Sequence, residues 1–250
     1  MRSLLAVLLL GSSGLFAQEA IPAGTVLPVQ LKSSLDSLKS RPGQRITARI
    51  TQDVPLPPAR QAQQRLGSKI PAGAKVTGHV TELATNGGIG PTVSLRFDAV
   101  NFRGHTIPVT TNLRAMASMM DVEDAQVPPV GTDRGTPWAW MNTIQIGGEA
   151  VYGQGGEVTH GSQVVGQYAP GGVLVRLSDK PGSSCRGAVE GNDRPQALWV
   201  FSSDACGLYG FRDLKIKHAG CTAPLGQITL VSTSARLHVS AGSGLLLRVQ

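Results

Sequence analysis

The sequence predicts an all-β protein, and three observations support this. The chain of 250 residues contains 31 glycines and 16 prolines, more turn-forming residues than long helices tolerate. Hydrophobic residues make up 41% of the chain and charged residues only 16%, so the composition suits a packed core and not a charge-rich disordered chain. Short runs in which apolar and polar residues alternate recur, as in half-buried strands. We expect a small N-terminal β-barrel followed by a second β-rich region, either a sandwich or a barrel-like sheet.

The N-terminus has the organisation of a secretory signal peptide. Arg2 precedes an unbroken apolar run from Leu4 to Leu10, and Ala17 supplies the small residue expected before a cleavage site. The run is much shorter than the ~20 residues of a membrane-spanning helix. We therefore expect residues 1–17 to be removed and the mature chain to begin at Gln18. The exported protein would be periplasmic or extracellular, without a transmembrane segment and with a possible attachment to the envelope surface.

The clearest internal feature is a turn followed by a strand. Ile21–Leu27 reads IPAGTVL, Ile70–Val76 reads IPAGAKV, and a weaker copy, Val239–Val249, lies at the end of the sequence. Proline presets φ at the first corner of a turn, and glycine accepts the positive φ at its exit. We therefore expect equivalent corners of one barrel, with positive φ at both glycines. The residues assigned to these corners are Pro22, Gly24, Pro71 and Gly73.

The remaining elements follow from periodicity. In Arg45–Thr51 the apolar residues alternate with arginine and threonine, which predicts a strand with its basic residues in water. Leu31, Leu35 and Leu38 are spaced to share one face of a short helix, and Asn101–His105 is typical of a hairpin connection. The other expected strands are Thr25–Leu31, Lys75–Glu82, Thr92–Val100, Thr106–Thr110, Thr143–Ile146, Val173–Leu177, Ala197–Phe201, Leu214–Lys217 and Gln227–Val231.

A boundary is expected near the middle of the chain. Residues 115–137 include an acidic cluster and a stretch rich in proline and glycine, which is typical of a linker or a mobile loop. The sequence thus predicts a β-barrel domain over residues 18–114 and a second β-rich domain over residues 138–250, with the second domain able to pack on the first.

Three cysteines in an exported chain leave one without an intramolecular partner. Between Cys185 and Cys206 lie a turn-forming segment, Glu190–Pro195, and the expected strand Gln196–Phe201. A hairpin there would bring its two flanks together, so we predict a disulfide between Cys185 and Cys206. The alternative pairs Cys206 with Cys221. No Cys-x-x-C pair exists and the histidines are scattered, so the sequence indicates neither a metal site nor a cofactor.

The positive charge is concentrated near the N-terminus. Residues 21–80 contain nine basic residues and only two acidic ones. Such a region can bind nucleic acid, acidic polysaccharide or anionic lipid, or can simply be the solvated face of a sheet. No aromatic residue lies between Phe16 and Phe97, which argues against stacking of nucleic-acid bases. The candidate anion contacts are Arg41, Arg45 and Arg49.

Several segments of the first half are similar, in order, to one known family. The segments are Ile21–Pro28, Leu35–Ser37, Pro42–Gln44, Ala48–Val54, Ile70–Gly78 and Leu95–Val109. Together they resemble the outer-membrane-side β-barrel domain of the conjugal-transfer and type IV secretion bridging proteins. The resemblance implies a β-barrel module and an envelope setting, and it does not imply a working channel, because Ala115–Pro137 lacks the pattern of the family's helical antenna. Residues 138–250 resemble no family.

Three function classes follow. The first is a structural or assembly module that contacts envelope proteins or an anionic envelope surface. The second is an extracytoplasmic module that binds a polyanion or polysaccharide. The third is a hydrolase, in which Cys206 would be the nucleophile with His218 or His238 as base, or in which Glu82 and Asp98 would form a carboxylate pair.

Overall fold

The computed structural model describes residues 20–57, 66–85, 90–126, 142–152, 156–182 and 185–250. Within these ranges it contains twenty strands and one helix, α1 (Met119–Gln126), so the predicted all-β class is confirmed. The expected signal peptide and its cleavage site before Gln18 lie outside the described residues. A search of the described residues finds no helix with the length and apolarity needed to span a membrane.

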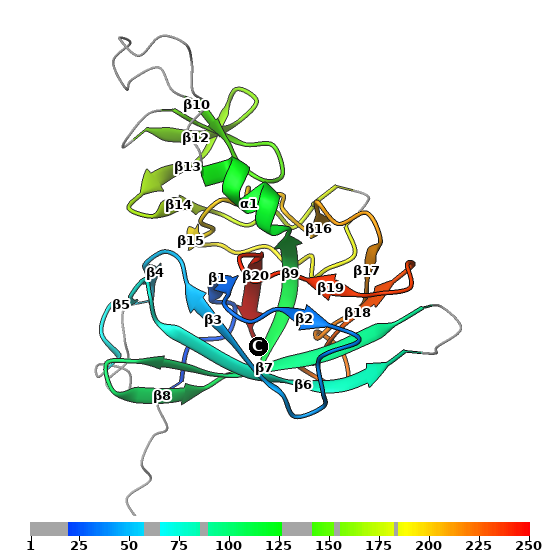
Figure 1. Ribbon diagram of the computed structural model, residues 1–250. Helices are drawn as coiled ribbons and strands as arrows, with labels where there is room; N and C mark the ends of the chain where they lie inside the picture. The colour runs from blue at the N-terminus through cyan, green and yellow to red at the C-terminus, as the bar shows by residue number, and fades with distance from the viewer. Residues whose placement is uncertain (1–19, 58–65, 86–89, 127–141, 153–155, 183–184) are drawn as a thin grey trace, which may run out of the picture.

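The largest sheet combines strands from both ends of the chain (Figure 1). Its strands are β1 (Val26–Leu31), β3 (Arg45–Ile50), β6 (Lys75–Ala84), β7 (Thr92–Phe102), β8 (His105–Pro108), β9 (Thr111–Ala117), β16 (Gly207–Tyr209), β17 (Leu214–Ala219), β18 (Ile228–Ser232) and β20 (Gly244–Val249). The order is β16-β9-β20-β1-β3-β6-β7-β18-β17, with β8 paired to β7. All pairs are antiparallel except β16 with β9.

This arrangement corrects the expectation of a closed N-terminal barrel. The path of paired strands begins at β16 and ends at β17, which do not pair with each other, so the sheet stays open. The strand β20 lies between β9 and β1, so residues near the end of the sequence occupy the place where the N-terminal strands would have to close on themselves. The expected boundary at residues 115–137 therefore separates strands that share one sheet.

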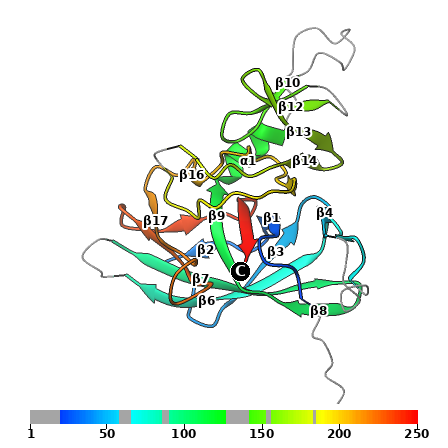
Figure 2. The same cartoon turned by 180° about the vertical axis from the view of Figure 1, so that it is seen from behind.

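A second sheet has six strands in the order β10-β11-β12-β13-β14-β15. They are β10 (Asn142–Ile144), β11 (Ala150–Tyr152), β12 (Glu157–His160), β13 (Gln163–Ala169), β14 (Gly172–Val175) and β15 (Gln196–Ala197). Figures 1 and 2 show it on one side of the large sheet, with α1 beside it. Two small pairs, β2 (Leu35–Asp36) with β19 (His238–Val239) and β4 (Val54–Pro55) with β5 (Lys69–Ile70), complete the fold.

The predicted Pro-Ala-Gly corners have the same geometry. Gly24 and Gly73 have φ values of +82° and +86°, as expected. In each turn the fourth residue donates its amide to the carbonyl of the proline, at 3.2 Å. The amide of each glycine donates to the carbonyl of the last residue of a neighbouring strand, Val249 of β20 for Gly24 and Ile50 of β3 for Gly73, both at 2.8 Å. The proline is the first residue of the turn and not its first corner, so the glycine carries the reversal.

The same turn occurs twice more. Gly43 and Gly242 have φ values of +80° and +96°. Their amides donate to the carbonyls of Val80 and Leu31 at 2.8 Å. The four turns precede β1, β3, β6 and β20, which are adjacent in the large sheet. The repeated sequence therefore marks a repeated structural unit: a turn of four residues that begins a strand and sets its register.

Two hydrophobic cores share the central strands. Within the large sheet, alternate residues such as Ile46, Val76 and Phe97 form the first core. On β20, Leu245 and Leu247 face this core, whereas Leu246 faces a second core between the two sheets. The second core also includes Val26 of β1, Val158 of β12 and the rings of Trp199 and Phe201. Strands buried on both faces are typically continuous apolar runs, like Leu245–Leu247 of β20.

Three local expectations need correction. The helix expected from Leu31 to Leu38 is wrong, because Leu35 begins a strand that pairs with β19, and Leu38 is 66% exposed. The strand expected over Ala197–Phe201 ends at Ala197, because Trp199 adopts φ +57° and places its ring in the second core. The linker expected over residues 115–137 contains the end of β9 and α1, and residues 127–137 lie outside the described residues. The hairpin connection is confirmed at Arg103-Gly104, between paired Phe102 and His105.

Candidate functional site: a basic groove on the large sheet

The predicted anion contacts lie on the solvent side of β3. Ile46, Ala48 and Ile50 are buried, so Arg45 and Arg49 point away from the core. Arg41 is also exposed but belongs to the turn that precedes β3. Of the three arginines, the structure therefore places two on one sheet face.

The neighbouring strand β6 adds cations to this face. Pairing places Arg45 opposite His79 and Arg49 opposite Lys75. Arg49 and Lys75 carry like charges directly opposite each other, which is unfavourable in a sheet, so this pairing has a cost to stability. Among the described residues, no carboxylate lies within ion-pair distance of Arg45, Arg49 or Lys75. The face therefore retains positive charge that a bound anion would neutralise.

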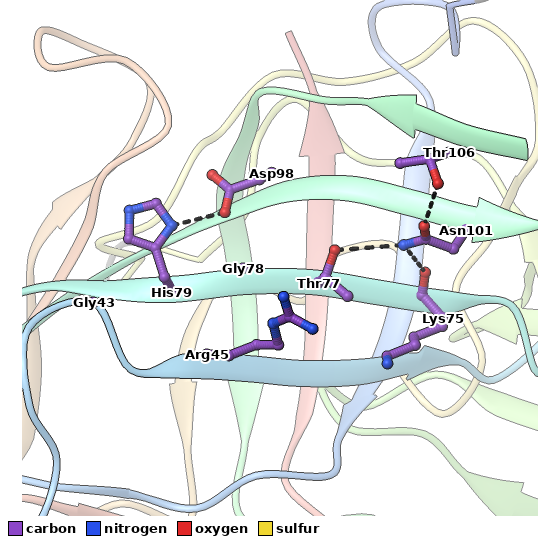
Figure 3. A pocket seen from close by; sticks show the side chains of 9 residues that line it. All are labelled: Gly43, Arg45, Lys75, Thr77, Gly78, His79, Asp98, Asn101 and Thr106. Atoms are coloured by element: carbon purple, nitrogen blue, oxygen red, sulfur yellow. Dashed lines mark hydrogen bonds and ion pairs between the residues drawn. The ribbon is translucent and has the colours of Figure 1, made fainter.

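A groove of about 580 Å³ runs beside these cations (Figure 3). We call it the basic groove; its lining residues are Gly43, Arg45, Lys75, Thr77, Gly78, His79, Asp98, Asn101 and Thr106. Hydrogen bonds order its uncharged part. Thr106 Oγ1 donates to Asn101 Oδ1 at 2.7 Å, and Asn101 Nδ2 donates to Thr77 Oγ1 at 3.4 Å. The groove thus offers cations at one wall and amide and hydroxyl groups at the other.

His79 and Asp98 form a pair at the end of the groove. His79 Nδ1 lies 2.7 Å from Asp98 Oδ2, which fixes the ring and leaves Nε2 toward the solvent. The register between β6 and β7 shifts at Gly78, and Asp98 is the extra residue at that point. A Cβ on Gly78 would lie 2.0 Å from the carbonyl oxygen of Arg96, so this shift requires glycine. Periodicity of the sequence does not predict the His79–Asp98 pair. The signal that could have indicated it is a glycine inside a strand, which often marks a bulge.

The disulfide between Cys185 and Cys206 is confirmed, with a Cα–Cα distance of 5.1 Å, and Cys221 is free and exposed. The hairpin that was expected to bring the two cysteines together does not form. Between the two cysteines the described residues form only the two-residue strand β15, which pairs with β14 and not within a hairpin. Because the sulfur of Cys206 is in the disulfide, it is not available as the nucleophile considered for a hydrolase.

A buried arginine, and not a hairpin, holds together the two segments that carry the disulfide. Arg114, on β9, is 1% exposed and donates to five backbone carbonyls. These carbonyls, at 2.6–3.5 Å, belong to Ser178, Ala188, Glu190, Ser203 and Ala205. Burial lowers the pKa of Arg114 to about 10, so the group stays protonated at neutral pH. One side chain therefore holds both segments that carry the disulfide.

A buried carboxyl group supports the same segment. Glu149 is fully buried and accepts hydrogen bonds from the amide of Ser203, at 2.9 Å, and from its hydroxyl. His160 Nδ1 lies 3.9 Å from this carboxylate and 3.5 Å from that of Asp204. Burial raises the pKa of Glu149. Within the described ranges, no group of three or more metal-ligating side chains is arranged to hold a metal ion.

The carboxylate pair considered for a hydrolase does not form a common site. Glu82 pairs across the sheet with Ser94, whereas Asp98 is bonded to His79 further along the strands. The geometry thus favours binding at the basic groove.

The comparisons with known proteins do not assign this site to a family. No protein-family model matches the chain, and no curated protein matches it. The basic groove is therefore the feature of the molecule that points to a function.

Proposed function

We propose that this protein is an exported binding module that holds an acidic polysaccharide of the cell envelope in the basic groove. The observation that carries the proposal is the set of unpaired cations on one sheet face, Arg45, Arg49 and Lys75, beside a groove lined by hydroxyl and amide groups. The cations suit the carboxylate or sulfate groups of such a polymer, and Thr77, Asn101 and Thr106 suit its hydroxyls.

The lining favours a polysaccharide over a nucleic acid. Single-stranded nucleic acids are commonly held by aromatic rings on which their bases stack. The residues that line the basic groove include no phenylalanine, tyrosine or tryptophan. Binding through charge and hydrogen bonds alone should be sensitive to salt, because exposed charges are screened within about 10 Å at 0.1 M ionic strength.

Export and an envelope setting belong to the same proposal. They rest on the signal-like N-terminus and on a disulfide, which persists in oxidising compartments. The resemblance of residues 21–109 to the type IV secretion bridging proteins supports a role beside other envelope components. N-terminal sequencing of the protein from a periplasmic or extracellular fraction should begin at or near Gln18, and an intact Met1 in that fraction would contradict a cleaved signal.

The binding test uses hyaluronan, in which acidic and uncharged sugars alternate, and isothermal titration calorimetry. Replacing Arg45→Gln and Lys75→Gln together should weaken binding about tenfold or more, because a hydrogen bond to a charged group contributes about 1.5–3 kcal/mol. Arg176→Gln is the matched control, since Arg176 is exposed and directly follows β14 of the other sheet. An unchanged affinity of the double variant would overturn the proposal, as would equal binding of uncharged dextran. Preference for single-stranded DNA or for vesicles of anionic lipid would assign the groove to another class of ligand.

A further inference from the structure

A second groove lies on the large sheet, at the other end of β6 and β7. It has a volume of about 420 Å³ and is lined by Glu82 of β6, by Thr92 and Ser94 of β7, and by Lys217 and Thr229 of β17 and β18. We call it the hydroxyl groove. Ser94 and Thr229 lie opposite each other, with their hydroxyl oxygens 2.9 Å apart.

The two grooves open on the same face of the sheet. Val80 and Leu95 pair across β6 and β7 and point into the core. The register then shifts between Val80 and Glu82, which places Glu82 opposite Ser94 on the outer side. Leu83, the next residue, packs against the core. The bulge therefore keeps the outer face continuous from Lys75 to Ala84, a distance of about 30 Å at the rise of a β-strand.

The two grooves differ in charge. Arg45 and Lys75 line the basic groove, and its one carboxylate is bonded to His79. The hydroxyl groove contains one basic side chain, Lys217, and one acidic side chain, Glu82, so their formal charges balance. Hydroxyls can donate and accept hydrogen bonds. Ser94 and Thr229 are buried and bonded to each other, so Thr92, with the exposed Glu82 and Lys217, offers the groove's accessible polar groups. An acidic group fits the first groove, and an uncharged sugar fits the second.

The strands between the grooves are also polar on this side. Arg96, which is half-buried, pairs across the sheet with His79. A polymer that crosses from one groove to the other would therefore pass over side chains able to donate to it, and would not meet an apolar barrier.

We propose that the basic groove and the hydroxyl groove are two subsites of one track, and that the ligand is a linear chain of acidic and uncharged sugars long enough to occupy both. This inference rests on the proposed function and deepens it. It requires that affinity increase with chain length, because a short chain can contact only one subsite whereas a long chain gains the contacts of both without a second loss of translational freedom.

The test measures the binding of hyaluronan oligosaccharides of defined length. A dodecasaccharide should bind the parent protein at least tenfold more tightly than a tetrasaccharide. The double variant Glu82→Ala with Lys217→Ala leaves the net charge of the protein unchanged, so it tests the hydroxyl groove without altering long-range attraction. It should weaken the dodecasaccharide to nearly the affinity of the tetrasaccharide and leave the tetrasaccharide unaffected. Unchanged melting temperature of the variant shows that the fold is retained.

Two results would overturn the inference. One is equal affinity of the short and the long chain for the parent protein, and the other is an unchanged affinity of the long chain for the Glu82/Lys217 variant. If the Arg45/Lys75 variant still loses binding in either case, the proposed function stands and only the second subsite is wrong. If neither variant affects binding, both the track and the basic groove are excluded as the site.

Discussion

The large sheet is organised by local turns, whereas the segment from Leu177 to Cys206 is positioned by groups from elsewhere in the chain. Four turns with a positive-φ glycine begin four adjacent strands of the large sheet, and each is closed within four residues. The described part of the Leu177–Cys206 segment contains only β15 as regular structure. It is held by Arg114, Glu149 and a disulfide, which act across separations of 21 residues or more.

This difference has an energetic consequence. The stability of the large sheet is distributed over many turns, ladders and apolar contacts, so no single polar group should be decisive there. The irregular segment depends on a few buried polar interactions, and the cost of an unpaired buried polar group exceeds the net gain of a satisfied one. Substitutions should therefore have larger and more concentrated effects in the irregular segment.

The largest effect is expected from Arg114→Met. The substitution keeps much of the side-chain volume and removes the guanidinium that donates to the five carbonyls. It should lower the free energy of unfolding by about 3–5 kcal/mol, because a buried acceptor left without its donor costs about 1–3 kcal/mol. Chemical denaturation measures this loss. Arg176→Met, at an exposed arginine that directly follows β14, is the control and should change stability by no more than about 0.5 kcal/mol. Equal stability of the two variants would show that the carbonyls do not depend on Arg114.

Removing the disulfide should have the next largest effect. The two cysteines are 21 residues apart, and closing a loop of that size is worth about 3 kcal/mol in the chain-entropy account. Cys185→Ser with Cys206→Ser should lower the melting temperature accordingly, whereas Cys221→Ser should not. If the disulfide variant loses more stability than Arg114→Met, the covalent link and not the arginine is the main support of this segment.

The sequence predicts the large sheet well because its signals are local. The strands at Arg45, Lys75 and Thr92 follow from alternation within a few residues, and Gly24 and Gly73 follow from the chemistry of a turn. Sheet closure is not local: nothing near β1 indicates that β20 is its partner. The same limit applies to Arg114, because an isolated arginine on a strand gives no indication of which distant carbonyls it will bind.

The site was predicted in part for the same reason. Arg45 and Arg49 were identified because charge density and alternation are visible in one strand. Lys75, His79, Asp98 and Asn101 join them only through the register of β3, β6 and β7, including a bulge at Gly78. A bulge moves one side chain out of alternation, and periodicity alone does not locate it.

A smaller effect is expected when a single turn of the large sheet is altered. No atom lies within 4 Å of a Cβ placed on Gly73, so Gly73→Ala tests the backbone conformation alone. Its φ of +86° should cost about 1–2 kcal/mol for a residue with a Cβ. Gly43→Ala should cost the same, because that site is equally open and has φ +80°. Gly182→Ala is the control, being open without a positive φ. Thermal unfolding compares the three, and unequal losses at Gly43 and Gly73 would contradict the equivalence of the turns.

The smallest expected effects are pH-dependent and have opposite signs at two carboxyl groups, Asp36 of the β2–β19 pair and Glu149, which supports the irregular segment. Asp36, on β2 of the small strand pair, accepts hydrogen bonds from the Arg236 guanidinium, which lowers its pKa from 3.8 to about 2. The ionised carboxylate therefore stabilises the folded state above about pH 4, and this contribution is lost as the pH falls toward 2. Asp36→Asn should be less stable than the parent at neutral pH, and the difference should shrink over that interval.

Glu149 should behave in the opposite way. Burial raises its pKa above the value of 4.5 that it would have in the unfolded chain, so the folded state holds the proton more tightly. Its contribution to stability improves as the pH falls from neutrality through the raised pKa, before the loss at Asp36 begins. The difference in unfolding free energy between the parent and Glu149→Gln should therefore move in favour of the parent on mild acidification. Chemical denaturation at a series of pH values between 7 and 2 measures both the gain in stability from Glu149 and the loss from Asp36. If the unfolding free energies of the parent and of Glu149→Gln change in parallel with pH, the buried carboxyl group is not the source of the gain in stability on mild acidification. The irregular segment would then be distinguished by its packing and not by a titrating group.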